Sequence, residues 1–423
     1  MSEPQTPRHP SRPAGRILVI EPMASGLEML KAARETGLEV VAISANEGDR
    51  AVPSVLGQHI DRLIELETND EPALVEAALR LHAEAPFRAV IPGFEFYVDS
   101  AARLAARLGL PGLDPAAAER LRDKARMRAA VAAAGLRVPL HQEARTAGEL
   151  DMAADHVGFP AVLKPTTSAG SVHVSRVDNL TDLRRAYAWM AEDSRTDLGR
   201  GLDGRVLLEE YVAGPEVSVE GYVVDGAPVI VSVTAKELGP EPYFVEVGHT
   251  VHRDLEPEER ARIDSYVTGV CQALGVTLGP FHCELRLPAG DPVLIEIGAR
   301  LAGDHICDLI ELATGVSLPR IMLAAYADLP LEEVAPARVP SAKYAAIHFF
   351  TAPGLATLSR VDGWESMTRD ESVVEAELYL SPGDDVPPMQ DFRGRIGHVI
   401  YRADSFADAA AARAAFGRMV RFG

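Results

Sequence analysis

Two glutamates have the spacing of a divalent-cation site on a predicted hairpin. Segment 281–300 (FHCELRLPAGDPVLIEIGAR) has two apolar runs on either side of a turn that contains Pro and Gly. A turn centred in this segment would pair Leu287 with Val293. Counting outward then places Glu284 opposite Glu296 on one face. Such carboxylates repel by ~3 kcal/mol at an effective dielectric constant of ~20, and Mg²⁺, which takes one or two carboxylates and substrate phosphates, would offset this. The alternative is a solvated hairpin face.

A lysine followed by small residues forms a candidate phosphate site. Lys164 ends the apolar strand FPAVLK, and 165–171 (PTTSAGS) follow it. A loop of small residues can bring backbone N–H groups against an anion, while the lysine supplies positive charge. The alternative is a surface lysine whose aliphatic stem covers apolar neighbours. Lys124, in RDKARMR, lies on a predicted helix, and spacing alone does not distinguish it from a solvent-facing lysine.

The segment 206–226 (VLLEEYVAGPEVSVEGYVVDG) predicts a strand, a turn and a second strand. Glu209 ends the first strand. Three polar side chains alternate onto one face of the second strand: Glu216, Ser218 and Glu220. These carboxylates could bind a ribose, while the backbone at Tyr211 and Val212 meets the edge of a base. The alternative is an exposed acidic sheet face.

A carboxylate and an imidazole lie three residues apart in the segment 242–255 (PYFVEVGHTVHRDL). These are Glu246 and His249, and His252 follows. Several nearby prolines and glycines predict a loop here. A carboxylate and an imidazole at this spacing can recognise an ammonium and a carboxylate, or move a proton. The alternative is a loop histidine with no such role.

The elements that must position these side chains change in type along the chain. Strands at 16–20, 39–44 and 88–92, with helices between them, predict an open parallel sheet in the first 115 or so residues. Its first turn, 21–26, lacks the GxGxxG pattern of a dinucleotide site. After a helix at 122–134, short β-rich segments predict an α+β region, with strands at 161–164, 172–177, 206–211, 216–224, 229–234, 281–287 and 293–297. Helices are predicted at 257–274, 304–325 and 405–420, and 328–340 is a predicted linker.

The composition of the chain limits the kinds of molecule that it is expected to bind. The chain has 423 residues, a net charge of −20 and a pI near 5.1, so its field repels nucleic acids and anionic lipid headgroups. Its three cysteines have no CxxC spacing, and residues 1–16 lack the apolar core of a signal peptide. We therefore expect a cytoplasmic protein with neither a membrane nor a nucleic acid as partner.

Four motifs, taken in order, resemble the ATP-grasp superfamily. They are DK at 123–124, VLKP at 162–165 with its TTSAGS loop, LLEEYVAGPEVSVE at 207–220, and CEL with IEIGAR at 283–300. The resemblance covers about 15–325 and implies an α/β and α+β fold in which ATP lies between two antiparallel sheets. The expected parts are a disordered tail (1–15), a pre-grasp α/β domain with a parallel sheet (16–115), a small lid domain with its lead-in helix (116–212), a large antiparallel-sheet domain (213–330) and a C-terminal α+β subdomain (341–423).

The resemblance also implies roles for site residues. Contacts with the α and β phosphates are implied for Lys124 and Lys164. Positions over the γ-phosphate are implied for Ser168, Gly170 and Ser171. The adenine pocket would be lined by Glu209, Tyr211 and Val212, and the ribose held by Glu216. Glu284 and Glu296 would bind Mg²⁺, or Mn²⁺ in its place, and Arg300 the transferred phosphate or the tetrahedral intermediate. Many members have Asn two residues after the second metal-binding Glu, whereas this chain has Gly298, so one metal ligand of those members is absent here.

Within the superfamily, the chain looks most like the L-amino-acid ligases. The similarity lies in FVEVGH at 244–249, IEIGARLAGDHI at 295–306, AIHFFTAPG and GRIGHVI. It implies phosphorylation of a carboxylate to an acyl phosphate, attack by an amine, and release of ADP and phosphate. Substrate contacts would come from Lys236, Glu246, His249 and Arg300, with Glu246 at the ammonium of the first amino acid and His249 and Arg300 near its reacting carboxylate. The expected substrates are amino acids, and a homodimer is an expected assembly. The alternatives are a carboxylase of the biotin- or purine-carboxylase type and a non-catalytic nucleotide-binding ATP-grasp protein.

Overall fold

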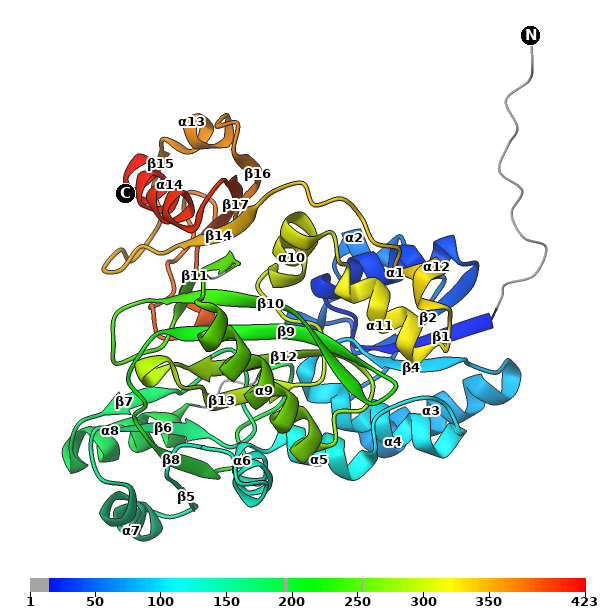
Figure 1. Cartoon of the computed structure of the whole chain (residues 1–423), viewed down its shortest axis with the longest axis horizontal. Helices are drawn as coiled ribbons and strands as arrows, with labels where there is room; N and C mark the ends of the chain where they lie inside the picture. The colour runs from blue at the N-terminus through cyan, green and yellow to red at the C-terminus, as the bar shows by residue number, and fades with distance from the viewer. Residues whose placement is uncertain (1–14, 194–196, 253) are drawn as a thin grey trace.

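The N-terminal part of the chain is a parallel sheet covered by helices. The computed structural model describes residues 15–193, 197–252 and 254–423, so the predicted tail lies outside the described residues except for Gly15. The sheet has the order β3-β2-β1-β4, and β1, β2 and β4 are labelled in Figure 1. Its strands are β1 (Gly15–Ile20), β2 (Leu38–Ser44), β3 (Arg62–Glu65) and β4 (Ala89–Pro92). The helices beside it are α1 (Leu27–Glu35), α2 (Ser54–Gly57), α3 (Glu71–Glu84) and α4 (Val98–Leu108). The predicted parallel sheet is thus confirmed.

A small antiparallel sheet follows, with the order β5-β8-β6-β7. Its strands are β5 (His141–Ala144), β6 (Ala161–Pro165), β7 (Ser175–Val177) and β8 (Val206–Glu210). Helices α7 (Ala147–Val157) and α8 (Leu180–Glu192) bury Leu150 and Leu183 against it. The prediction of a strand from 172 is wrong, because Ser171 and His173 adopt positive φ and the strand begins at Ser175.

Two helices lead into the small sheet, where the sequence predicted one. They are α5 (Pro115–Arg122) and α6 (Lys124–Ala133). Asp123 separates them because its extended backbone starts a new helix, and its carboxylate accepts hydrogen bonds from the N–H groups of Ala125 and Arg126. Lys124 is therefore the first residue of α6.

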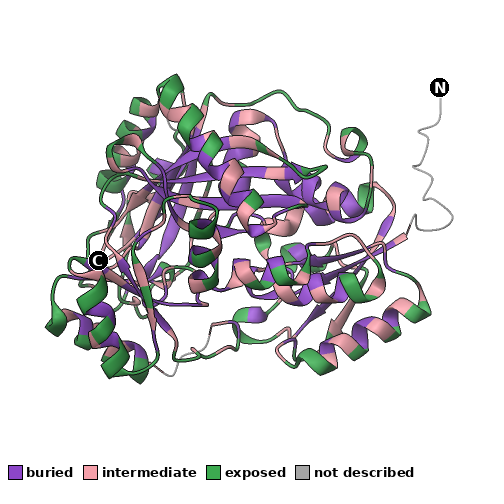
Figure 2. Ribbon diagram, turned by 60° about the horizontal axis from the view of Figure 1, so that its bottom comes forward, coloured by how far each residue is buried: buried purple, intermediate pink, exposed green. Residues whose placement is uncertain are grey.

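The largest sheet has eight strands in the order β13-β12-β9-β10-β11-β14-β17-β16. The strands are β9 (Glu216–Val224), β10 (Ala227–Leu238), β11 (Glu246–Val251), β12 (Gly279–Arg286), β13 (Val293–Gly298), β14 (Tyr344–Phe350), β16 (Val373–Leu378) and β17 (Gly397–Ala403). The predicted helix at 257–274 is confirmed as α9 (Pro257–Leu274), which buries Val267 and Val270 against the sheet. Figure 2 shows much of the strand surface buried and the outer faces of the helices exposed.

Two elements of this part differ from the prediction. The predicted loop that contains Glu246 and His249 is wrong, because β11 pairs with β10 on one side and β14 on the other, which satisfies its backbone groups. The predicted helix 304–325 is two helices, α10 (Ile306–Thr314) and α11 (Leu318–Tyr326). Gly315 separates them: it has φ +74, and a Cβ there would lie 1.9 Å from the carbonyl oxygen of Arg338.

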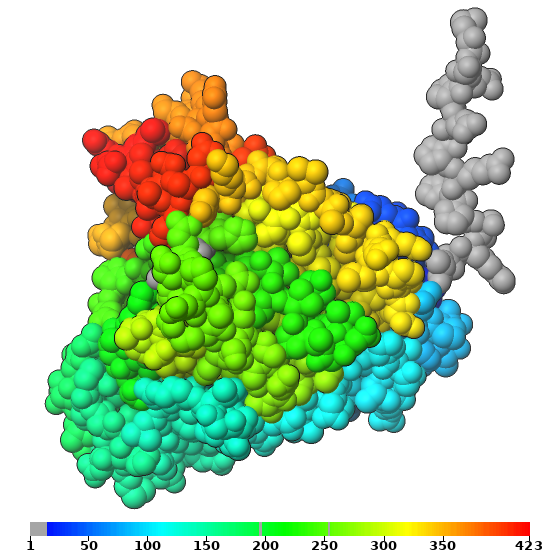
Figure 3. Space-filling model, in the orientation of Figure 1, coloured from blue at the N-terminus to red at the C-terminus, as the bar shows by residue number. Residues whose placement is uncertain are grey.

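The C-terminal residues extend the eight-stranded sheet. After α12 (Leu331–Val334), strands β14, β16 and β17 continue it. A short ribbon of β15 (Val361–Asp362) and β18 (Arg421–Phe422) lies beside the helices α13 (Trp364–Thr368) and α14 (Phe406–Met419). The helix predicted at 405–420 is confirmed as α14. In Figure 3 the C-terminal residues, in orange and red, lie against the green and yellow residues. None of the helices in the described ranges has the length and apolarity to span a membrane.

Candidate active site

The hairpin of β12 and β13 places two carboxylates opposite each other. Glu284 pairs with Glu296, as predicted. The predicted pairing of Leu287 with Val293 is wrong by one residue, because Val293 pairs with Arg286. A register shift between Glu284 and Leu285 restores the pairing of the glutamates.

Each glutamate of the hairpin contacts a buried lysine. Lys124 Nζ lies 2.9 Å from Glu296 Oε1, and Lys236 Nζ lies 2.9 Å from Glu284 Oε1. The lysines thus offset the repulsion between the carboxylates. The donor set fits Mg²⁺, which prefers carboxylate oxygens. Gly298 adds no ligand, and a Cβ there would lie 2.5 Å from Glu95 Oε2, so the carboxylate of Glu95 fills the space that a larger residue would need.

Lys164 is held on β6 by a buried ion-pair triad. Its Nζ lies 2.5 Å from Glu209 Oε2, and Arg128 Nε donates to Glu209 Oε1 at 2.8 Å. Burial lowers the pKa of Lys164, although the carboxylate opposes this. Burial would raise the pKa of Glu209, but the two cations outweigh it and lower that pKa to about 2. The carboxylate of Glu209, a predicted adenine-pocket residue, is thus used by Lys164 and Arg128.

Arg128 belongs to the site but was not predicted from the sequence. Its side chain is fully buried, and a guanidinium N–H donates to the carbonyl of Ile295 at 2.5 Å, beside the register shift of the hairpin. The available signal was its position on the face of α6 that also carries Met127 and Val131, both buried. A charged residue on an apolar face needs a buried partner.

The loop of small residues lies over Lys124. Lys124 Nζ donates to the carbonyl of Ser168 at 2.7 Å. Gly170 and Ser171 adopt φ of +64 and +60, and a Cβ on Gly170 would lie 2.6 Å from a ring carbon of Phe392. The C-terminal part of the chain therefore limits the space beside this loop.

The predicted base and ribose residues lie around the end of β8 and the start of β9. The Tyr211 hydroxyl donates to Glu241 at 2.7 Å, and Val212 is buried. Glu216 Oε2 lies 2.7 Å from Arg286 Nε, and its other oxygen lies 3.1 Å from Lys236 Nζ.

Lys236 lies at the centre of three carboxylates. Its ammonium is 2.5 Å from Glu246, 2.9 Å from Glu284 and 3.1 Å from Glu216. Burial would lower the pKa of Lys236, but the three carboxylates outweigh burial and hold this pKa well above its ordinary value. The residues predicted for ribose, metal and substrate thus meet around one cation.

His249 on β11 connects this cluster to the C-terminal part of the chain. Its Nε2 lies 3.4 Å from Glu246 and 3.1 Å from Asp304, and Asp304 lies 2.8 Å from Arg395. Burial would lower the pKa of His249, but hydrogen bonds to the carboxylates of Asp304 and Glu246 raise it. Asp304 and Arg395 were not predicted from the sequence, because only the pairing of β11, β14 and β17 brings them together.

Arg300 is oriented by Glu95, which lies in the connection between β4 and α4. The Nε of Arg300 donates to one carboxylate oxygen of Glu95, and the other oxygen accepts from Arg122 at 2.8 Å. Arg122 also donates at 3.1 Å to the carbonyl of Thr167, in the loop of small residues that follows Lys164. Burial would raise the pKa of Glu95, but Arg300 and Arg122 lower it to about 2. Glu95 was also missed, because GFEF at 93–96 carries no recognisable motif.

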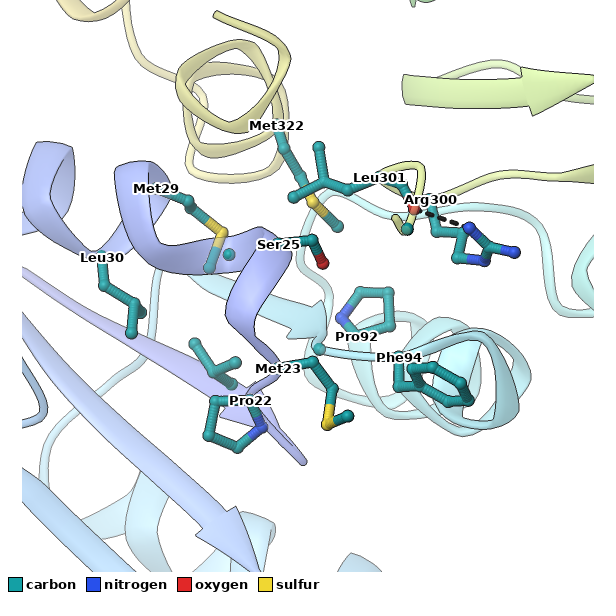
Figure 4. Close-up of a pocket in the computed structure, with 14 residues that line it drawn as sticks. Pro22, Met23, Ser25, Met29, Leu30, Pro92, Phe94, Arg300, Leu301 and Met322 are labelled. Carbon is teal, nitrogen blue, oxygen red and sulfur yellow. Dashed lines mark hydrogen bonds between the residues drawn. The ribbon is translucent and has the colours of Figure 1, made fainter. Parts of the chain in front are cut away.

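An apolar pocket adjoins Arg300 (Figure 4). It lies where the carboxyl ends of β1 and β4 meet α1 and α11. Its lining includes Pro22, Met23, Met29, Phe94, Leu301 and Met322. Arg300 donates to the carbonyl of Leu301 at 2.7 Å, so the guanidinium is fixed at the edge of the pocket.

Three family models match the chain. They are an ATP-grasp N-terminal domain at 30–112, an ATP-grasp domain at 157–308, and an L-amino acid ligase C-terminal domain 2 at 348–423. Alanine–anticapsin ligase of Bacillus subtilis is 26% identical over 61% of this chain and 58% of its own length. Carnosine synthase 1 of Gallus gallus is 31% identical over 56% of this chain and 27% of its own length. The chain therefore spans less than two thirds of the length of each of these two relatives.

Two further proteins match nearly the whole chain. An uncharacterized protein of Sinorhizobium fredii is 29% identical over 93% of this chain and 79% of its own length. The crystal structure of an L-amino acid ligase from Bacillus licheniformis has a TM-score of 0.80 and 24% identity, and the match covers 98% of this chain and 99% of that one.

Proposed function

We propose that this chain, which belongs to the ATP-grasp superfamily and ends in an L-amino acid ligase C-terminal domain, joins the carboxylate of one amino acid to the amine of another with ATP as phosphoryl donor. The family and the fold predicted from the sequence are confirmed by the matched domains and by the solved structure with a TM-score of 0.80. Relatives named as ligases support the ligase class. The choice of substrates and the roles of the site residues are our proposal.

One observation carries the proposal: a row of charged side chains, linked by ion pairs and by the strand pairing of two opposed glutamates, leads from the phosphate-site residues to Glu246. Lys124 contacts Glu296, which pairs with Glu284 across the hairpin. Glu284 contacts Lys236, and Lys236 contacts Glu246. An amino acid whose ammonium binds Glu246 would therefore have its carboxylate beside the residues that hold the phosphates.

The phosphates are assigned to Lys124 and Lys164, with the loop 168–171 over them. Arg128 and Glu209 position Lys164, and the carbonyl of Ser168 positions Lys124. Glu284 and Glu296 would hold Mg²⁺, which when bound neutralises charge on phosphate oxygens.

His249 is assigned as a hydrogen-bond donor to the carboxylate of the amino acid that is phosphorylated. Its raised pKa, caused by Asp304 and Glu246 against the effect of burial, keeps the imidazole protonated at higher pH than a free histidine. The protonated imidazole donates hydrogen bonds, so we assign His249 the role of orienting the substrate carboxylate. Arg300, fixed by Glu95, supplies a permanent positive charge where the tetrahedral intermediate develops negative charge.

The reaction balances as two displacements. A carboxylate oxygen of the first substrate attacks the γ-phosphorus, and the bond to ADP breaks, which gives an acyl phosphate. The amine nitrogen of the second substrate then attacks the carbonyl carbon, the bond to phosphate breaks, and the nitrogen loses a proton as the amide forms. The apolar pocket beside Arg300 favours an apolar side chain on one of the two amino acids.

The proposal is tested by phosphate release from MgATP with amino acids supplied singly and in pairs, with product masses recorded. We expect release with particular pairs, a condensed product, and ADP rather than AMP. Glu296→Gln should lose most activity while retaining part of the ATP affinity, and Glu237→Gln, a β10 carboxylate that contacts Arg413, is the matched control. Bicarbonate-stimulated release without a condensed product, or tight ATP binding without turnover across the panel, would contradict the proposal.

A further inference from the structure

A second cluster of metal-ligating side chains lies where α10 meets the C-terminal strands. It consists of His305, just before α10, Glu375 on β16 and His398 on β17. One ligand atom from each residue lies within 4.8 Å of the others. None of the three takes part in the proposed ligase reaction.

His398 has a buried nitrogen that lacks a hydrogen bond. The side chain is 0% exposed, and Nδ1 lies 2.8 Å from the Tyr379 hydroxyl. Its Nε2 forms no hydrogen bond with any residue that the structure describes. A buried polar atom without a hydrogen bond destabilises the folded state, so a ligand at Nε2 would remove this penalty.

His305 is oriented in the manner of a metal-binding histidine. Its Nδ1 lies 3.0 Å from a carboxylate oxygen of Asp308, and the two imidazole rings of His305 and His398 have centroids 4.6 Å apart. When Nδ1–H donates to a carboxylate or hydroxyl oxygen, the lone pair of Nε2 is free to bind a metal ion, and such donation fixes the ring. Asp308 and Tyr379 can both act in this way.

Glu375 supplies the third ligand from the solvent side. Its Oε1 lies 3.7 Å from His398 Nε2, and its side chain is 54% exposed. This separation is too long for a hydrogen bond. It is close to the about 3.3 Å that separates two ligands of one tetrahedral ion with metal–ligand distances near 2.0 Å.

We propose that His305, Glu375 and His398 form a binding site for a divalent transition-metal ion of the Zn²⁺ type. Two imidazoles and one carboxylate suit Zn²⁺ and disfavour Mg²⁺, which prefers oxygen ligands. The fourth position is left for water. The ion would connect the start of α10 to β16 and β17, next to Asp304, which contacts His249 and Arg395. It would therefore hold the C-terminal strands against the substrate side of the site.

Binding of Co²⁺, which absorbs visible light when nitrogen ligands surround it in a tetrahedral site, tests the proposal without ATP or substrates. The full chain is depleted of metal and titrated with CoCl₂ in excess MgCl₂. We expect one equivalent with intense visible absorption that ZnCl₂ abolishes. Glu375→Gln and His305→Asn should each weaken binding at least 10-fold. Glu375 is exposed, so its variant should fold even where a histidine variant does not.

Matched controls separate this site from other carboxylates and histidines. Glu371→Gln, before β16, and His348→Asn, whose Nδ1 contacts the carbonyl of Val247, should bind Co²⁺ as the unaltered chain does. Glu296→Gln should also leave the absorption unchanged, so failure of the ligase proposal and failure of this one are distinguishable. Equal Co²⁺ affinity in Glu375→Gln and the unaltered chain, or the absence of nitrogen-ligand absorption, would overturn the proposal.

Discussion

Glu95 links three parts of the candidate site through one carboxylate. It binds Arg300, it binds Arg122, and it fills the space beside Gly298. Because each oxygen of this carboxylate binds one guanidinium, Glu95 fixes the positions of both arginines at the same time. Glu95 is thus a positioning residue for Arg300, and Gly298 is the residue that gives it room.

Gly298→Ala is expected to lower kcat at least 10-fold and also to lower the melting temperature, because the ion pairs of the buried Glu95 carboxylate are disturbed. The new Cβ would lie 2.5 Å from Glu95 Oε2, so the carboxylate must move and Arg300 loses its partner. Steady-state kinetics and thermal melting check this, with Gly148→Ala, where a Cβ meets nothing within 4 Å, as control. A double variant with Glu95→Gln should lose little more than either single variant; additive losses would contradict the coupling.

The pKa of Glu209 predicts how stability depends on pH. Arg128 and Lys164, acting against burial, lower this pKa to about 2 from an ordinary value of 4.5. A lowered folded-state pKa contributes stability that is present above about pH 4.5 and is lost as the pH falls toward 2. The free energy of unfolding, measured by urea between these values, should fall more steeply for the unaltered chain than for Glu209→Gln. Equal slopes would show that Glu209 carries no such contribution.

At the scale of elements, the features that were predicted correctly are those that local sequence patterns determine. The parallel sheet, α9 and the opposed glutamates follow from apolar periodicity and turn residues. The register shift near Glu284 could not be predicted, because nothing in the sequence alone indicates that the Ile295 carbonyl binds Arg128. β11 was predicted as a loop because several prolines and glycines lie near it, and one of the two strands that pair with it, β14, begins only at Tyr344.

The loop over the phosphates makes a prediction at this scale. Gly170→Ala should raise KM for ATP several-fold, because the added Cβ would lie 2.6 Å from Phe392 and push the loop away from the C-terminal part. Gly135→Ala, also at positive φ but with nothing within 4 Å of its Cβ, controls for backbone strain. Phe392→Ala should restore KM in the double variant. If it does not, the contact with Phe392 does not limit the loop.

Across the whole molecule, the C-terminal strands and the large domain form one sheet. β11 pairs with β14, and Arg395 contacts Asp304. A chain that ends at residue 340 should therefore expose the edge of β11 and aggregate when refolded from urea. Light scattering and circular dichroism check this, with the full chain refolded in parallel. A monodisperse, folded product would show that the sheet is complete without these strands.

The same pairing bears on how the protein is made on the ribosome. β11 ends at Val251, and its partner β14 begins only at Tyr344. At about 5–20 residues per second, several seconds or more of translation separate the two strands. During that interval the nascent chain presents an unpaired strand edge that can join a neighbouring polypeptide. A chaperone that covers the edge of β11 until β14 has been synthesised would therefore raise the yield of native protein.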